Sequence, residues 1–287
     1  MIKYIKIDGG ISILESNEFN IKHILECGQL FRYEQTDFGY KIYAKDHKIE
    51  VCCQKGITNI FCKDLNFIEN YFDLSNDYAR IMHELSDESC LKSAINFGNG
   101  IRILNSDPLE MIISFIISAN NNIPRIKKII SNLCTLYGTK KNDFYAFPTL
   151  DQLLLITEEE FKKMGCGYRA NYLVNAIKTL NNFDISYLKE LSTNDLRVEL
   201  MKLKGVGRKV ADCILLFGFH RTDVFPTDTW IIKVYNEISG SNESKSNAKN
   251  ISEWFVQKYK DLSGYAQQYL YYERLFRDKE KKNDNSK

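Results

Sequence analysis

The sequence predicts an α+β protein in which an N-terminal antiparallel β-sheet domain is followed by a larger, mainly α-helical domain. Two observations carry this prediction. Apolar and polar residues alternate in short segments within the first ~95 residues, as in half-buried strands. From about residue 100, apolar residues recur at helical spacing behind helix-capping residues. We expect domains at 1–97 and 98–275, and a polar, frayed tail at 276–287.

The expected strands lie in the first part of the chain. Residues 1–7 alternate between apolar and polar types, and GITNIFC (56–62) is a further apolar segment. Between them, YKIYA (40–44) and KIEVCC (48–53) are separated by a short polar turn. This arrangement is typical of a β-hairpin.

The expected helices begin in the same region and dominate the rest of the chain. Ser16–Asn17 is expected to cap a short helix that runs through Glu26, with Gly28 just beyond it, and 66–97 to form helices joined by polar turns. The later signals are Asp107–Pro108 before LEMIISFIIS, Thr157 with Glu160 before FKKMG, Ser192 or Thr193 before LRVELMKL, and GYAQQYLYYERLF (264–276) as a final helix.

Composition and charge narrow the possible classes. No apolar run approaches the roughly 20 residues that span a bilayer, and MIKYIKIDGG lacks a signal-peptide core, so we expect a cytoplasmic protein, nucleoid-associated if prokaryotic. The net charge of +2 does not by itself indicate nucleic-acid binding, which needs only a local stripe of cations. The eight cysteines form no CxxC pair, and the four histidines are scattered, so we expect no metal site.

Residues 196–219 carry the most informative pattern. Two amphipathic segments flank KGVGR, in which Gly205 and Gly207 allow a tight turn and a close approach of the backbone to another group. The second helix would begin with free amides, which form a ready phosphate site. An ordinary turn between two helices explains the glycines equally well at this point.

Lys209 and Asp228 favour a catalytic role for this region over an ordinary turn between two helices. Lys209 stands in the first turn of a helix whose next residues, VADCILLFG, are nearly all apolar. Burial there would depress its pKa and make it a usable amine nucleophile. Nineteen residues later, Asp228 stands at the start of another predicted helix, where the free amides keep a carboxylate ionised. Asp228 alone is equally explained as a helix cap.

The segment resembles the signature of the helix-hairpin-helix (HhH-GPD) glycosylase superfamily, a hairpin followed by a Gly/Pro-rich loop and an essential aspartate. Within it, GVGRKVADC is similar to the 8-oxoguanine DNA glycosylases, in which the lysine after the hairpin is the nucleophile. The resemblance therefore implies that Lys209 and Asp228 are catalytic. The iron–sulfur branches of the superfamily carry four cysteines after this region, whereas no cysteine follows Cys213 here.

Further matches follow in the family's order. The resemblance implies that Gly28 reads the lesion through its backbone carbonyl and that Gln267, Tyr271 and Cys213 contact the flipped base. SANNNIPR (118–125) and GYRA (167–170) match the segments that face the opposite strand. The residues implied there are Asn120, Arg125 and Arg169 at the unpaired base and Tyr168 as a wedge in the gap. Gly205, Gly207 and Trp230 are implied at DNA phosphates.

The resemblance implies a bifunctional DNA glycosylase and AP lyase that excises 8-oxoguanine from duplex DNA. A neutral Lys209 would attack C1′, and the resulting Schiff base would permit β-elimination. The family pattern implies a monomer and no cofactor, apart from a cation at the hairpin carbonyls. Two departures stand out: Trp230 replaces an expected histidine and Tyr271 replaces an expected phenylalanine. The alternatives are a glycosylase for another damaged base and a non-catalytic hairpin module that only binds DNA.

Overall fold

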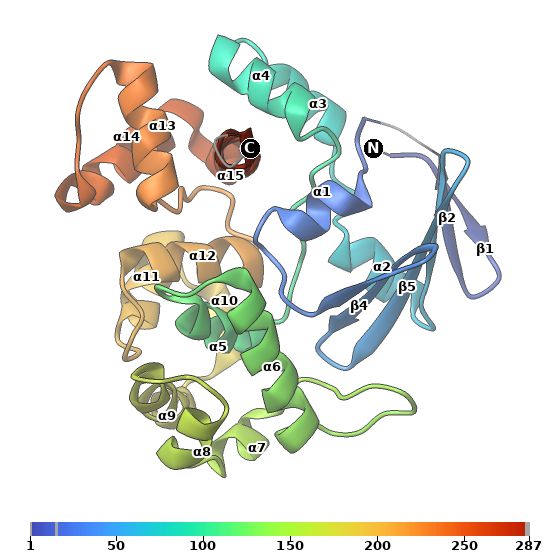
Figure 1. Ribbon diagram of the computed structural model, residues 1–287, viewed down its shortest axis with the longest axis vertical. Helices are drawn as coiled ribbons and strands as arrows, with labels where there is room; N and C mark the ends of the chain where they lie inside the picture. Colours follow the sequence, from blue (N-terminus) through green and yellow to red (C-terminus); the bar gives the residue numbers. More distant parts are fainter. Residues whose placement is uncertain (1, 15–16, 285–287) are drawn as a thin grey trace.

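The computed structural model describes residues 2–14 and 17–284. A six-stranded antiparallel sheet forms one side of the molecule and helices form the rest, so the predicted α+β class is confirmed (Figure 1). The strands are β1 (Tyr4–Ile7), β2 (Gly10–Leu14), β3 (Tyr33–Thr36), β4 (Gly39–Ala44), β5 (His47–Gln54) and β6 (Ile57–Phe61). The helices of the first half are α1 (Ile21–Glu26), α2 (Leu65–Tyr71), α3 (Tyr78–Leu85), α4 (Ser89–Phe97), α5 (Pro108–Ser118), α6 (Ile123–Tyr137) and α7 (Leu150–Leu154). The remaining helices are α8 (Glu158–Lys163), α9 (Arg169–Leu180), α10 (Ile185–Glu190), α11 (Thr193–Met201), α12 (Arg208–Gly218), α13 (Thr229–Ser239), α14 (Ala248–Tyr259) and α15 (Ser263–Asp284), with short 3₁₀ turns at Lys245–Asn247 and Lys260–Leu262.

The sheet has the strand order β1-β2-β6-β5-β4-β3, and every neighbouring pair is antiparallel. The predicted hairpin is confirmed as β4 and β5, which pair Ile42 with Ile49. The sequence analysis missed β2 and β3. β2 is buried at four consecutive positions and therefore shows no alternation, and β3 is a short, polar strand at the edge of the sheet.

Two short helices close the inner face of the sheet. Buried side chains of α1 and α2 form one apolar cluster with alternate residues of the strands, among them Ile11, Ile49 and Ile60. The cap of α1 differs from the expected one, because the side chain of Asn20 accepts the hydrogen bond from the amide of His23. Of the residues expected to cap it, Ser16 lies outside the described residues.

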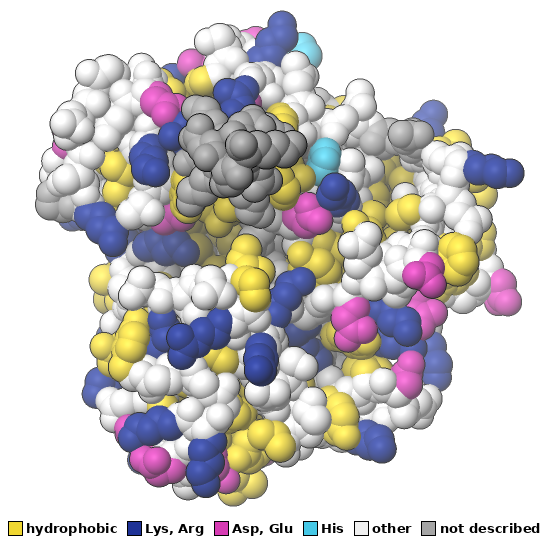
Figure 2. Space-filling view, viewed as in Figure 1, with side chains coloured by type: hydrophobic (Ala, Val, Ile, Leu, Met, Phe, Trp, Pro, Cys, Tyr) yellow, Lys and Arg dark blue, Asp and Glu magenta, His cyan; other side chains and the backbone are white. Residues whose placement is uncertain are grey.

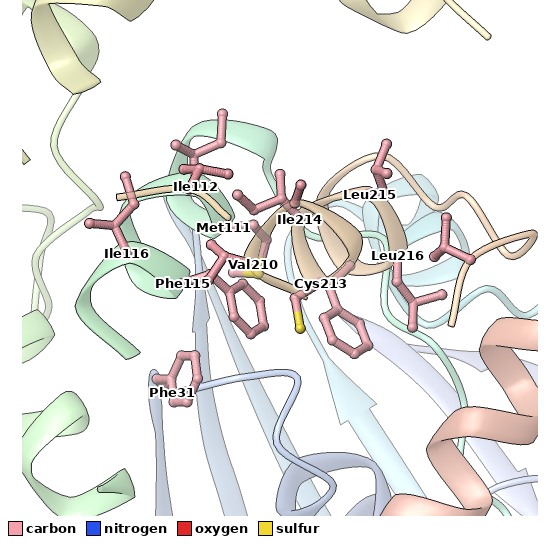
Figure 3. Close-up of a cluster of buried hydrophobic side chains, with 14 of the residues drawn as sticks. Phe31, Met111, Ile112, Phe115, Ile116, Val210, Cys213, Ile214, Leu215 and Leu216 are labelled. Atoms are coloured by element: carbon pink, nitrogen blue, oxygen red, sulfur yellow. The ribbon is translucent and has the colours of Figure 1, made fainter. Parts of the chain in front are cut away.

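The helical part is centred on α5 and α12, which pack against each other. The predicted caps are confirmed: Asp107 caps α5 ahead of Pro108, Thr157 forms a capping box with Glu160, and Ser192 caps α11. Figure 3 shows the apolar side chains of α5 and α12 packed together, and the ring centres of Phe115 and Phe31 lie 5.8 Å apart. This packing fixes the position of α12 relative to the sheet domain.

Helices α3, α4 and α15 join the helical core from opposite ends of the chain. The buried residues of α3 and α4 cluster with that core, although both helices precede the predicted boundary at residue 97. Helix α15 packs against α4 and α13 and continues to Asp284, so it extends into the segment expected to fray. Residues 285–287 lie outside the described residues. Over the described part of the chain, no helix is long and apolar enough to cross a membrane.

Arg102 is fully buried in the segment that connects the sheet domain to the helical domain, and it anchors this segment to the sheet domain. The guanidinium of Arg102 donates to the backbone carbonyls of Glu18 at 3.0 Å and Phe72 at 2.9 Å, and to that of Asp73. It also lies 3.8 Å from the centre of the Tyr78 ring. Because buried polar groups are costly without partners, one side chain here satisfies several carbonyls at once.

Replacing Arg102 with methionine is therefore expected to lower the free energy of unfolding by about 3 kcal/mol, since the buried carbonyls lose their donors. Urea unfolding followed by circular dichroism measures the effect. Arg80→Met, at an exposed arginine of α3, is the matched control and should stay within about 0.5 kcal/mol of the parent. An equally small change for Arg102→Met would contradict the structural role assigned to this arginine.

Candidate active site

A small cavity lies where the sheet domain, α12 and α15 meet. It has a volume of about 40 Å³. Its lining residues are Cys27, Gly28, Phe115, Lys209, Cys213, Phe217, Pro226, Asp228, Gln267, Gln268 and Tyr271. The structure thus brings together every residue that the sequence assigned to catalysis or base recognition. The volume holds only a few water molecules, so a lining side chain must move before a purine can enter.

Lys209 is the second residue of α12, and its Nζ lies 5.7 Å from the centre of the Phe115 ring. Burial acts to lower the pKa of this lysine, but its interactions with the Cys213 side chain, a hydrogen bond among them, and with the Asp228 carboxylate outweigh that effect. The pKa of Lys209 therefore lies above its ordinary value, and the expectation of a depressed pKa is wrong. Lys209 is an ammonium ion here and must lose a proton before its nitrogen can attack.

Asp228 caps α13. Its Oδ1 accepts hydrogen bonds from the backbone amides of Trp230 at 2.9 Å and Ile231 at 3.0 Å. The predicted position at a helix N-terminus is therefore confirmed. The cap fixes the carboxylate at the cavity wall, where its negative charge acts on Lys209.

Cys213 follows Lys209 by one helical turn and is 4% exposed. Burial raises the pKa of its thiol, which outweighs the opposing effect of the Lys209 ammonium. The group is therefore an uncharged thiol at neutral pH. It adds a polarisable, weakly donating wall to the cavity.

Gly28 stands where both the backbone and the packing require glycine. Its φ is +82°, and an added Cβ would lie 3.2 Å from the Tyr271 ring. The loop is held by Gln29, a buried residue that the sequence analysis missed. Its Nε2 donates to the carbonyls of Ile24 at 3.0 Å and Arg102 at 2.8 Å, and its Oε1 accepts from the amide of Leu104 at 2.9 Å.

Helix α15 supplies Gln267, Gln268 and Tyr271 to the cavity. Burial is the main cause that raises the pKa of the Tyr271 hydroxyl, and the nearby Asp228 carboxylate adds to it. The hydroxyl therefore stays uncharged at neutral pH. Gln267 and Gln268 are both buried, and Gln268 Nε2 donates to Gln267 Oε1 at 2.7 Å. The sequence analysis missed Gln268 because neighbours on a helix ordinarily point in different directions.

A second group of predicted residues lies on the exposed surface around the turn between α5 and α6. Asn120 has a positive φ of 50°, and Tyr168 is 55% exposed. Arg125 is exposed and donates to the carbonyl of Gly165 at 2.9 Å, with the remaining N–H groups of its guanidinium available for other contacts. The predicted wedge, Tyr168, and a hydrogen-bond donor, Arg125, therefore lie on the same exposed surface.

Arg169, which the resemblance places at the unpaired base, is buried beside the same turn. It is 3% exposed, and its guanidinium donates to the carbonyls of Ala119 at 2.7 Å and Asn120 at 2.5 Å. It also lies 4.5 Å from the centre of the Tyr168 ring. Arg169 therefore holds the Asn120 turn and the wedge tyrosine in place through three of its five N–H groups, and its expected contact with a base stays a prediction.

The predicted turn of the helix-hairpin-helix segment, with Gly205 and Gly207, lies between α11 and α12. Gly205 has a φ of +88°, and an added Cβ would lie 2.8 Å from the Tyr172 ring, whereas no atom lies within 4 Å of the Cβ position at Gly207. Open space at Gly207 leaves room for a phosphate against the start of α12. Trp230 is half-buried in the first turn of α13, and Lys233 Nζ lies 4.7 Å from the centre of its ring.

Lysine and arginine side chains gather on one face of the molecule despite the small net charge of the chain (Figure 2). Figure 2 shows lysine and arginine side chains on both sides of a hollow between the part containing α12 and the part containing α13 to α15. Such an arrangement suits a phosphate backbone. Among residues 2–14 and 17–284, no group of three or more His, Cys, Asp or Glu side chains is placed to hold a metal ion.

Comparisons with known proteins agree with this arrangement. Residues 12–112 match the family described as 8-oxoguanine DNA glycosylase, N-terminal domain, and residues 113–259 match the HhH-GPD superfamily of base excision DNA repair proteins. N-glycosylase/DNA lyase OGG1 of Arabidopsis thaliana is 34% identical over 61% of this chain, although the match spans only 52% of that protein.

Two further matches cover most of this chain and most of the matched protein. A probable N-glycosylase/DNA lyase of Methanothermobacter thermautotrophicus is 31% identical over 71% of this chain and 72% of its own length. The 8-oxoguanine glycosylase/lyase of Clostridium acetobutylicum, solved with double-stranded DNA that carries cytosine opposite 8-oxoG, is 37% identical. It has a TM-score of 0.89, with 97% of this chain and 98% of that chain covered.

Proposed function

The chain belongs to the HhH-GPD superfamily of base excision DNA repair proteins, and from that membership we propose that it excises 8-oxoguanine from duplex DNA and then cleaves the strand. The cavity is the observation that carries the proposal. It places an amine and a carboxylate, Lys209 and Asp228, beside groups suited to bind a flipped base. A module that only binds DNA needs neither of these two charges in such a cavity.

The proposed reaction begins with extrusion of the damaged nucleotide, because the glycosidic bond is not accessible inside the base stack. Once Lys209 has given up its proton to solvent water, Nζ forms a bond to C1′ while the bond from C1′ to N9 breaks and its electron pair leaves with the base. The carboxylate of Asp228 stabilises the positive charge that develops on the sugar. The sugar ring then opens to give a Schiff base on Lys209. Loss of a C2′ proton expels the 3′ phosphate oxygen.

Discrimination between 8-oxoguanine and guanine depends on the hydrogen atom at N7. 8-Oxoguanine carries N7–H where guanine has a lone pair, so a fixed acceptor binds the first and repels the second. We propose the carbonyl of Gly28 as this acceptor, since the residue lines the cavity and its loop is held by Gln29. An unmade buried hydrogen bond costs about 1–3 kcal/mol. Gln267 would bind the Watson–Crick edge, with Cys213 and Tyr271 against the faces of the base.

The same proposal covers the contacts outside the cavity. Tyr168 would fill the gap, with Asn120 and Arg125 beside the unpaired base, and Arg169 would hold that turn in place. Gly205, Gly207 and Trp230 would contact phosphates. The chemistry needs no cofactor, although a cation at the hairpin carbonyls would help to hold a phosphate. We propose a monomer that acts in the cytoplasm.

Borohydride trapping on duplexes that carry 8-oxoguanine, guanine or dihydrouracil tests the proposal. The reagent reduces the Schiff base and leaves a covalent complex between protein and DNA. We expect strong trapping with 8-oxoguanine, little with dihydrouracil and almost none with guanine. Preferential trapping with dihydrouracil would assign the chain to another damaged base, and no trapping with any duplex would reject the lysine mechanism.

Arg125→Met is expected to reduce the preference for cytosine opposite the lesion by about 10-fold. Cytosine presents the acceptors N3 and O2, which a guanidinium matches, whereas adenine presents a donor beside its N1 acceptor. The measurement is single-turnover excision on four duplexes that differ only in the opposite base. Arg80→Met removes an exposed arginine from α3 and is the matched control. If the parent treats all four duplexes alike, Arg125 does not contact the unpaired base.

A further inference from the structure

Gln268 is a buried polar residue of the cavity that the proposed mechanism leaves without a role. It is 2% exposed and lines the cavity together with Gln267. Its Nε2 donates to Gln267 Oε1, but its own Oε1 is buried with no hydrogen-bond partner in the described part of the chain. Because buried acceptors are ordinarily paired, an orphaned amide oxygen beside a binding cavity indicates that the ligand supplies the missing donor.

Counting acceptors on Gln267 leads to the same conclusion. An amide oxygen has two lone pairs, and the hydrogen bond from Gln268 uses one of those on Gln267 Oε1. One acceptor position then remains on Gln267 for the base. The Watson–Crick edge of a guanine-type base carries two adjacent donors, N1–H and the exocyclic amine at C2. Gln267 alone therefore cannot satisfy both, and a second acceptor is needed nearby.

We propose that Gln268 is a second base-reading residue, whose Oε1 accepts a hydrogen bond from the exocyclic amine of the flipped base. In the same arrangement, Gln268 orients the amide of Gln267, so that Gln267 Oε1 accepts from N1–H and Gln267 Nε2 can donate to O6. The pair reads three consecutive groups of the edge. This inference rests on the proposed function, and it adds selection for a 2-amino purine.

The test compares two lesions that differ only in the exocyclic amine. 8-Oxohypoxanthine keeps N1–H, O6, N7–H and the 8-oxo group of 8-oxoguanine but lacks the amine. Single-turnover excision is measured for both lesions opposite cytosine, and the ratio of the two rates is the readout. Both rates come from the same protein, so a general loss of folded enzyme cancels in the ratio.

The parent is expected to excise 8-oxoguanine at least about 10-fold faster than 8-oxohypoxanthine, because the second lesion leaves Gln268 Oε1 unpaired. Gln268→Met, which has similar length and no polar end, should bring the ratio close to one, mainly through a lower rate on 8-oxoguanine. Gln257→Met makes the same substitution on the exposed face of α14 and should keep the parent ratio. Gln268→Leu serves as a second variant if the methionine protein does not fold.

Two results would overturn the inference. The parent could excise both lesions equally, or the ratio could survive in both Gln268 variants, and an equal fall of both rates would then indicate a structural role only. Nicking of a duplex with a preformed abasic site, which has no base to read, separates these results from failure of the proposed function. A parent that nicks this duplex but releases neither lesion would reject the proposed substrate and this inference together.

Discussion

Lys209→Gln should abolish base release and strand cleavage, with a loss on the order of 10⁴-fold or more in the single-turnover rate. The substitution removes the only side-chain amine that lines the described cavity, and an amide nitrogen does not form a Schiff base. Duplex binding should be largely retained, because only one cation is lost among several near the hollow. Excision kinetics, borohydride trapping and a DNA-binding titration on the same duplex measure the three quantities.

Lys204→Gln is the matched control for this variant. Lys204 is an exposed lysine of the hairpin that donates to Asn171 Oδ1 at 2.6 Å, and it does not line the cavity. We expect weaker DNA binding with a nearly normal rate at saturation. Normal turnover by Lys209→Gln would reject the mechanism, whereas equal losses in both variants would mean that the two lysines contribute only positive charge.

Asp228→Asn should slow excision by about 100- to 1000-fold while binding is retained, since a charge that acts on the developing cation matters most in the transition state. An asparagine oxygen can still accept from the amides of Trp230 and Ile231, so the cap of α13 should persist and the melting temperature should change little. The measurement is single-turnover excision as a function of pH.

The pH profile separates charge from structure. The Asp228 carboxylate contributes to raising the pKa of Lys209, so its removal lowers that pKa. The neutral amine is then present at lower pH, and the rising limb of the rate profile should shift toward acid even as the maximum rate falls. Asp184→Asn, at the cap of α10, is the control and should leave the profile unchanged. A slower variant with an unshifted profile would contradict the electrostatic coupling.

Local signals in the sequence predicted the elements well. Asp107 with Pro108, Thr157 with Glu160, and Ser192 begin helices because each depends on hydrogen bonds within a few residues. What the sequence could not provide depends on contacts between distant segments. Helices α3 and α4 join the helical core only through packing partners much later in the chain.

In the candidate site, too, local sequence patterns predicted some features, whereas others depend on contacts between distant segments. The motifs located the residues of the cavity, but the direction of the Lys209 pKa depends on the balance between burial and two neighbouring groups, which only coordinates provide. Arg169 is a second example, because its partners are backbone carbonyls that no sequence pattern marks. Gln268 was missed since its role follows from one hydrogen bond and one orphaned oxygen.

The anchoring of the loop at Gly28 determines how much selectivity one carbonyl can provide. A compliant loop would yield when undamaged guanine presents its N7 lone pair, and the repulsion would be relieved by a small movement of the backbone. Gln29 connects this loop to the backbone of Ile24, Arg102 and Leu104 and so makes it stiff. Under the proposed role of Gly28, the accuracy of damage recognition is then a mechanical property, set by a glutamine that is fully buried beneath the site.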